Sequence, residues 1–149
     1  MMKWGAAAPI LRVEDVRESL QYYTDVLGFT PDWIYDDIAS VTRGDCTIFL
    51  CQGDQTNGRT WIWIGVPDVE ELERELRAKG AHIRQPPTNF DWALEMQVMD
   101  LDGNVLRIGS TSKPDKAYGP WLDAHGRLWY AQPDGSWRAF ESQQAPQIN

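Results

Sequence analysis

Apolar side chains recur at helical spacing in two stretches of the chain, residues 13–29 and 66–81. In each stretch an aspartate precedes the first apolar position, a glutamate follows that aspartate by three positions, and a glycine ends the pattern. An aspartate in this position caps a helix N-terminus, and glycine is favoured just beyond a helix C-terminus. The pattern predicts two helices of similar length, capped by Asp15 and Asp68 and ended at Gly28 and Gly80.

Short runs rich in apolar and β-branched residues surround both helices and predict strands. In the first half these runs are residues 9–13, 32–35, 38–42 and 47–52, with a turn at 43–45. In the second half they are residues 59–66, 82–84, 93–99 and 105–109, with a loop at Pro86 and Pro87 and a turn at 100–104. Each half therefore has the order strand, helix, strand, strand, strand, which indicates a duplicated unit.

The last part of the chain has a different pattern. Residues 111–119 are polar with proline and glycine and predict a linker. Residues 120–140 contain short aromatic runs separated by turn signals at 124–126 and 133–135, which predict a three-stranded meander. So small a meander is not stable alone, so we expect its aromatic residues to pack against the rest of the chain or a second chain. These residues are Trp121, Trp129, Tyr130, Trp137 and Phe140. Residues 141–149 are polar, and we expect them to be disordered.

Composition and charge narrow the possible functions. A chain of 149 residues is long enough to form one domain with a tail. A net charge of -8 argues against a nucleic-acid partner. The start of the chain has one lysine and a short apolar run interrupted by Pro9, which fits neither a signal peptide nor a membrane span, so we expect a cytoplasmic protein. Cys46 and Cys51 lie on opposite faces of one predicted strand, and we expect both to be reduced.

Two stretches resemble a known family, the vicinal oxygen chelate superfamily of glyoxalase I, extradiol dioxygenases, and fosfomycin- and bleomycin-resistance proteins. They are LRVEDVRESLQYYTDVLGF, similar to the family's opening strand and helix, and EMQVMDLDGNVLRIGS, similar to its closing hairpin. The resemblance implies an α+β fold for residues 1–110, in which two βαβββ modules, about 8–53 and 59–110, form an open eight-stranded cup around a ligand cavity. Residues 111–149 would be an extension. It also implies a homodimer, in which some members exchange modules.

The resemblance further implies where a metal would bind, because metal-dependent members carry His, Gln or Glu on the first and last strands of each module. Alignment on the helix-capping aspartates and on the two turns places Ala8, Thr47, Trp61 and Arg107 at those positions. None of these side chains is a good ligand for a divalent metal. His82 and His125 fall elsewhere. We therefore expect neither a metal nor another cofactor, as in the bleomycin-resistance branch.

Strand alternation predicts which side chains face the cavity. The isoleucines at 62 and 64, and the apolar residues at 48, 50, 94, 96, 98, 106 and 108, should form the core. The candidate ligand-binding residues are Arg12, Trp33, Thr47, Phe49, Trp61, Trp63, Trp92, Glu95, Gln97 and Arg107. Aromatic walls with a few polar groups suit a planar or amphipathic organic molecule. Alternatively, the tryptophans pack in the core or in a dimer interface, and Arg12 neutralises Glu95.

Two classes of function fit these residues. The first is a metal-free binding protein of the antibiotic-resistance kind, which stacks a small molecule on tryptophan and holds an anionic or carbonyl group with arginine. The second is a metal-independent lyase or isomerase, with Glu95 as the candidate general base and Arg107 or Arg12 stabilising an enolate-like charge. No nucleophile with a neighbouring base is visible, so the sequence favours binding. An interaction module without a ligand, built on the meander aromatics, is a third alternative.

Overall fold

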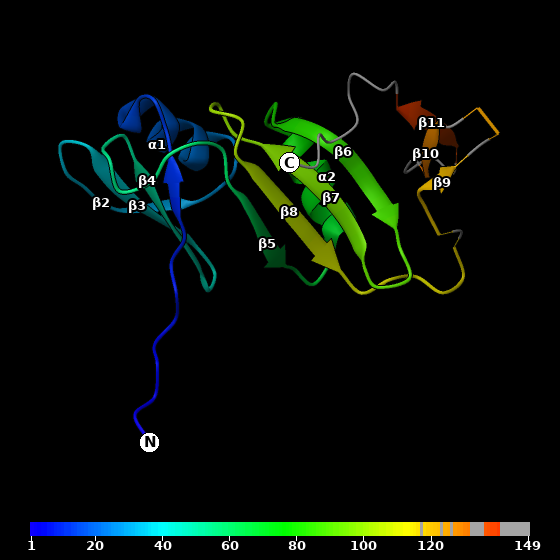
Figure 1. Ribbon diagram of the computed structural model, residues 1–149, viewed down its shortest axis with the longest axis horizontal. Coiled ribbons are helices and arrows are strands. Elements are labelled where there is room, and N and C mark those ends of the chain that lie inside the picture. The colour runs from blue at the N-terminus through cyan, green and yellow to red at the C-terminus, as the bar shows by residue number, and fades with distance from the viewer. Residues whose placement is uncertain (117, 123, 126, 132–135, 141–149) are drawn as a thin grey trace. The chain divides into compact units, whose positions relative to one another are not determined.

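The computed structural model describes residues 1–149 except 117, 123, 126, 132–135 and 141–149 (Figure 1). The first half contains β1 (Ile10–Arg12), α1 (Val16–Asp25), β2 (Thr30–Ile34), β3 (Ile38–Arg43) and β4 (Cys46–Cys51). The second half contains β5 (Trp61–Gly65), α2 (Val69–Ala78), β6 (His82–Asn89), β7 (Leu94–Met99) and β8 (Val105–Ser110). The predicted order of strand, helix and three strands is therefore confirmed in both halves, and the fold is α+β.

Both halves have the same sheet topology. The strand order is β1-β4-β3-β2 in the first four-stranded sheet and β5-β8-β7-β6 in the second. In the first sheet, β1 is parallel to β4, and the β2–β3 and β3–β4 pairs are antiparallel. The register of β2 against β3 shifts between Pro31 and Trp33, so Asp32 is the extra residue of a β-bulge.

Helix capping follows the sequence pattern in both modules. Asp15 Oδ1 accepts hydrogen bonds from the backbone N–H groups of Arg17 and Glu18, at 2.9 and 3.0 Å. Asp68 Oδ1 accepts the equivalent bonds from residues 70 and 71 at the same two distances. Gly28 and Gly80, which follow the helices, have positive φ angles of 73° and 80°.

Strand alternation correctly predicted the buried face of the sheets. In β4 the side chains of Ile48 and Leu50 are fully buried. The predicted core residues of β7 and β8 are buried as well; they are Leu94, Met96, Val98, Leu106 and Ile108. Residues 62 and 64 of β5 are half-buried. Cys46 and Cys51 are free cysteines, as predicted, and burial raises the pKa of the Cys46 thiol.

The predicted loop at Pro86 and Pro87 is wrong, because β6 continues through both prolines to Asn89. Proline lacks the backbone N–H that a central strand would need for its second neighbour. β6 lies at the edge of its sheet, where alternate residues point their N–H groups away from β7, so a proline at such a position is tolerated.

The segment after β8 is fixed to the second module by Asn89. The side-chain oxygen of Asn89 accepts from Lys113 N–H at 2.8 Å, and its amide nitrogen donates to the carbonyls of Lys113 and Lys116 at 2.8 and 3.2 Å. Gly119 N–H donates to the Asn89 carbonyl at 2.7 Å. The side-chain amines of Lys113 and Lys116 also pair with Glu70 of α2. The predicted linker is therefore an anchored segment.

Beyond this segment, β9 (Trp121–Leu122), β10 (Leu128–Ala131) and β11 (Trp137–Phe140) form an antiparallel sheet in the order β11-β10-β9. This confirms the three-stranded meander. Trp129 and Trp137 are half-buried, and a Cβ atom at Gly119 would lie 3.3 Å from the Trp137 ring. The predicted turn at 133–135 and the polar tail at 141–149 lie outside the described residues.

The turn between β7 and β8 is a centre of hydrogen bonding. Asp100 is buried and accepts bonds from the Tyr23 hydroxyl at 3.0 Å and from the side-chain and backbone N–H groups of Asn104 at 2.8 and 2.9 Å. Asn104 also donates to the Arg12 carbonyl, and Asp102 accepts from the backbone N–H of Glu14. Burial raises the pKa of Asp100, and it raises the pKa of Tyr23 well above its usual value. This turn therefore binds α1 and β1.

Contacts divide the chain into two compact units. One unit comprises Met1–Ile62, Leu76–His82 and Met99–Leu106, and the other comprises Trp63–Glu75, Ile83–Val98 and Arg107–Asn149. The turn at 100–104 thus belongs to the same unit as α1 and β1, although the sequence repeat places it in the second module.

Candidate functional site

The side chains of Trp63, Glu95 and Arg107 form one cluster on the second sheet. They come from β5, β7 and β8, and β8 is the neighbour of both other strands. Glu95 is only 3% exposed. Its Oε1 accepts a hydrogen bond from the Trp63 indole N–H at 3.2 Å, and its Oε2 accepts one from Arg107 Nε at 2.7 Å. One buried carboxylate therefore holds both an indole ring and a guanidinium group.

Strand register and a glycine explain how these side chains meet. The β7–β8 hairpin closes with a 3.0 Å bond from Asp100 N–H to the Asn104 carbonyl. Continuing this antiparallel register places Glu95 opposite Gly109 and Gln97 opposite Arg107. A Cβ atom at Gly109 would lie 3.2 Å from Glu95 Cγ and 3.3 Å from the Trp63 ring. Gly109 thus leaves the space in which the indole reaches the carboxylate.

The outer parts of this cluster are open to solvent. Trp63 is 59% exposed, and the Arg107 side chain is 40% exposed. Among the described residues, the two terminal amino groups of Arg107 have no hydrogen-bond partner. An aromatic surface and a fork of N–H donors are therefore both available to a ligand.

Gln97 and Gln85 extend the polar face beyond this cluster. Gln97 Nε2 donates to Gln85 Oε1 at 3.0 Å, across β7 and β6. Gln97 Oε1 is buried, and within the described part of the chain it has no hydrogen-bond partner. Gln85 was not among the predicted site residues, because the predicted strand ended at residue 84, before the two prolines.

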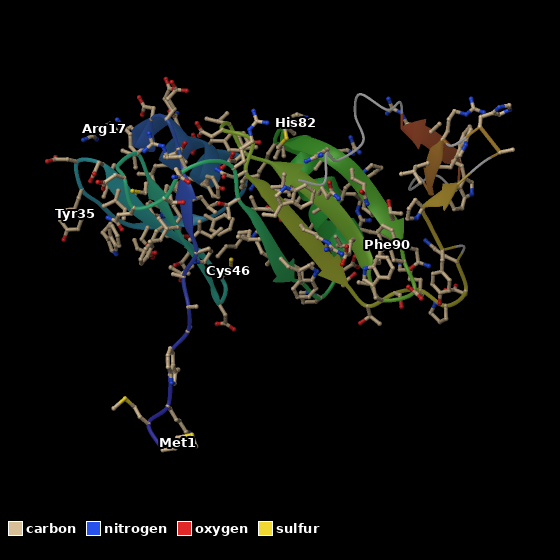
Figure 2. All side chains as sticks on the ribbon, in the orientation of Figure 1. Met1, Arg17, Tyr35, Cys46, His82 and Phe90 are labelled. Carbon is tan, nitrogen blue, oxygen red and sulfur yellow. The ribbon has the colours of Figure 1, made fainter. Side chains whose placement is uncertain are left out.

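The first sheet brings together another group of the predicted residues. The Trp33 ring lies 5.2 Å from that of Phe49 and 5.5 Å from that of Tyr35, which Figure 2 labels. The Thr42 hydroxyl donates to Asp32 at 2.8 Å, so in the 2.9 Å contact between the two threonine hydroxyls Thr47 donates to Thr42. This group is aromatic and hydroxyl-rich and contains no cationic side chain.

Arg12, Trp61 and Trp92 make other contacts. Arg12 donates to the carbonyls of Gln52 and Gly53, at the end of β4. Within its own unit Glu95 is already paired with Arg107, so it does not need Arg12 for neutralisation. Trp61 is 44% exposed on β5. Trp92 follows β6, is largely exposed, and stacks on Phe90 with the ring centres 4.5 Å apart. Figure 2 labels Phe90.

The four side chains at the family's metal positions do not fit a divalent metal, since an alanine, a threonine, a tryptophan and an arginine offer no suitable set of donors. In the described part of the chain, no three or more His, Cys, Asp or Glu residues are grouped so that they could hold a metal ion. Among the same residues, no helix is long and apolar enough to cross a membrane.

The family model of the Glyoxalase/Bleomycin resistance protein/Dioxygenase superfamily matches residues 6–108. The chain belongs to this superfamily, which confirms the resemblance found in the sequence.

Several solved structures share the fold. TnmS3, an antibiotic binding protein from Streptomyces sp. CB03234, has a TM-score of 0.66 and 19% identity over 75% of this chain and 100% of its own. The bleomycin-binding protein from bleomycin-producing Streptomyces verticillus, solved with copper(II)-bleomycin, has a TM-score of 0.59 and 24% identity over 76% and 100%. TioX from Micromonospora sp. ML1 has a TM-score of 0.63 and 20% identity over 71% and 98%. No curated protein matches the sequence.

Proposed function

We propose that this protein binds a planar or amphipathic small organic molecule, without a metal, on the tryptophan-bearing face of its sheets. The observation that carries the proposal is the buried Glu95, which orients Trp63 and Arg107 and leaves the outer parts of both exposed. An exposed indole held in one orientation loses little conformational freedom when it stacks on a ligand. The fixed guanidinium supplies hydrogen-bond donors beside it.

The remaining predicted residues have supporting roles in this proposal. Trp92 and Gln97, in the same unit as the Glu95 cluster, would add ligand contacts there. In the other unit Trp33, Phe49 and Thr47, with Arg12 and Trp61, would provide aromatic and polar groups for the ligand. Two structures of the same fold support a ligand of antibiotic type, since TnmS3 is described as an antibiotic binding protein and the Streptomyces verticillus protein as binding bleomycin. We propose a homodimer as the working assembly.

The arrangement of Glu95 favours binding over the alternative of a lyase or isomerase. A general base must reach the proton that it removes from the substrate. Glu95 is almost completely buried, and each of its oxygens already accepts a hydrogen bond from a neighbouring side chain. Its contacts suit a residue that positions Trp63 and Arg107.

The test is ligand binding by the purified protein, measured by calorimetry and by quenching of tryptophan fluorescence with a panel of planar aromatic compounds. Trp63→Leu should weaken binding about tenfold, or about 1.4 kcal/mol, because the stacking surface is lost. The matched control is Trp4→Leu, since Trp4 is 96% exposed and should not affect affinity. Treatment with a chelator should also leave affinity unchanged. Equal affinities of the Trp63 and Trp4 variants would contradict the proposal.

A further inference from the structure

The Glu95–Arg107 pair indicates the chemical class of the ligand. We infer that the group held by Arg107 is an uncharged carbonyl oxygen conjugated with an aromatic ring, as in an aryl amide or ester, and not a carboxylate or phosphate. This inference rests on the proposed function, because it concerns the ligand of the same cluster.

Charge is the first argument. The carboxylate of Glu95 lies 2.7 Å from Arg107 Nε, so the formal charges of the pair cancel. An anion bound to the outer amino groups of Arg107 would be attracted by a guanidinium whose charge Glu95 already offsets, and the Glu95 carboxylate would repel it. It would also have to give up its hydration. A neutral carbonyl oxygen accepts the same hydrogen bonds, meets no such repulsion and has a much smaller cost of desolvation.

The side chains next to the Glu95–Arg107 pair also disfavour a bound anion. Gln97 lies opposite Arg107 in the strand register, and its buried Oε1 has no hydrogen-bond partner in the described part of the chain. Its amide nitrogen is already bonded to Gln85 Oε1. The Glu95 carboxylate contacts the guanidinium, and the Gln97 amide oxygen belongs to the residue opposite it in the register, so both oxygens disfavour an additional anion on this face. The net charge of -8 adds a weaker repulsion at long range.

The geometry explains why the carbonyl should be attached to a ring. The indole N–H of Trp63 and the Nε–H of Arg107 bond to the two oxygens of the same carboxylate, so the stacking surface and the donor fork are held beside each other. A flat molecule whose carbonyl lies in the plane of its ring can use both groups without rotating an internal bond. A ligand with a flexible tail would lose more conformational entropy.

The experiment compares three probes with the same ring, namely 2-naphthamide, methyl 2-naphthoate and 2-naphthoate, by calorimetry at neutral pH. The wild-type protein should bind the amide and the ester about tenfold more tightly than the carboxylate. Glu95→Gln removes the negative charge and keeps the size of the side chain, so affinity for 2-naphthoate should rise about tenfold while affinity for the amide does not rise. Arg17→Gln removes a positive charge at an exposed position of α1 and should leave the order of the three affinities unchanged.

Each outcome separates the inference from the proposed function. Tighter binding of 2-naphthoate than of the amide by the wild-type protein would overturn the inference and leave aromatic binding intact. Failure of all three probes to bind would count against the proposed function itself. If Glu95→Gln does not fold, Arg107→Gln is the deciding variant. It should reduce affinity for the amide and the ester about tenfold, because both ligands lose the N–H groups that donate to their carbonyl oxygen. An unchanged affinity for both in that variant would remove Arg107 from the site.

Discussion

The outer strands of the two sheets have the same place in the strand order but differ in exposure. All five residues of β2 are exposed, whereas β6 is buried from Gln85 to Asn89. The segment at 111–119 accounts for part of this difference, because it is hydrogen-bonded to Asn89 at the end of β6. The comparison teaches that sequence outside the repeat contributes to the protection of an edge strand.

The last hairpins differ in a similar way. Gly44 and Asp45, between β3 and β4, form an exposed two-residue turn. The turn from Asp100 to Asn104, between β7 and β8, instead bonds to α1 and β1. At corresponding positions of β4 and β8, the first module carries Thr47 and the second carries Arg107. Under the proposed function, the first module therefore contributes aromatic and hydroxyl groups, and the second contributes the Glu95–Arg107 pair beside Trp63.

The largest loss of stability is expected from removing the hydrogen bonds of the β7–β8 turn. Asp100→Ala should lower the free energy of unfolding by about 3 kcal/mol, because it leaves the Tyr23 hydroxyl and the N–H groups of Asn104 without their buried acceptor. Asp45→Ala, in the exposed turn of the other module, should change stability by less than about 0.5 kcal/mol. Urea denaturation of both variants measures the difference. Similar losses of unfolding free energy in the two variants would show that the two turns contribute equally to stability, against the comparison.

A smaller effect is expected at the outer strands. Asn89→Ala should cost about 2 kcal/mol, since the backbone groups of Lys113 and Lys116 lose their partner at a buried position. Asp32→Ala in β2 removes the acceptor of the Ser40 and Thr42 hydroxyls at an exposed bulge, so the loss should be below about 1 kcal/mol. Hydrogen exchange of β6 and β2 amides in the two variants would locate each loss. Faster exchange in β6 is expected only for Asn89→Ala.

The smallest effect concerns the pH dependence of the anchored segment. The hydrogen bond from Lys113 lowers the pKa of Glu70 below its usual value. Because the folded-state pKa is the lower one, this stabilisation is fully present above the usual glutamate pKa and is lost as the pH falls through the lowered value. Glu70 is partly exposed, so Glu70→Gln should cost less than about 1 kcal/mol at neutral pH.

The check is the difference in unfolding free energy between wild type and Glu70→Gln, measured as the pH is lowered. That difference should disappear in acid, and Glu18→Gln, on the first turn of α1, is the matched control in the first module. A difference that persists below the lowered pKa would contradict the role of the ion pair.

Local signals were sufficient for most of the fold. The aspartate caps and the glycines after the helices depend on a few neighbouring residues, so the sequence predicted both helices correctly. The alternation that buries Ile48 or Met96 is also local. Pro86 and Pro87 were misinterpreted because their tolerance depends on the position of β6 at the sheet edge, which no local pattern contains.

Less of the candidate site than of the fold could be predicted from the sequence. Alternation placed Glu95, Gln97 and Arg107 on one face, but the partner of Glu95 depends on register and on the space left by Gly109. The anchoring role of Asn89 joins residues that are far apart in the chain, so no sequence pattern indicated it. The convergence of Ala8, Thr47, Trp61 and Arg107 around one hollow stays a prediction.

The position of the Asp100–Asn104 turn has a consequence for the origin of the chain. Asp100, in the second repeat, accepts the hydrogen bond of the buried Tyr23 hydroxyl in the first repeat. Asn104, also in the second repeat, donates to the carbonyl of Arg12 in the first. The first repeat alone therefore does not contain the groups that bond to its own Tyr23 hydroxyl and Arg12 carbonyl. If the gene arose by doubling, its half-length ancestor would have needed another molecule of itself to supply that turn, so association between copies would have preceded their fusion into one polypeptide.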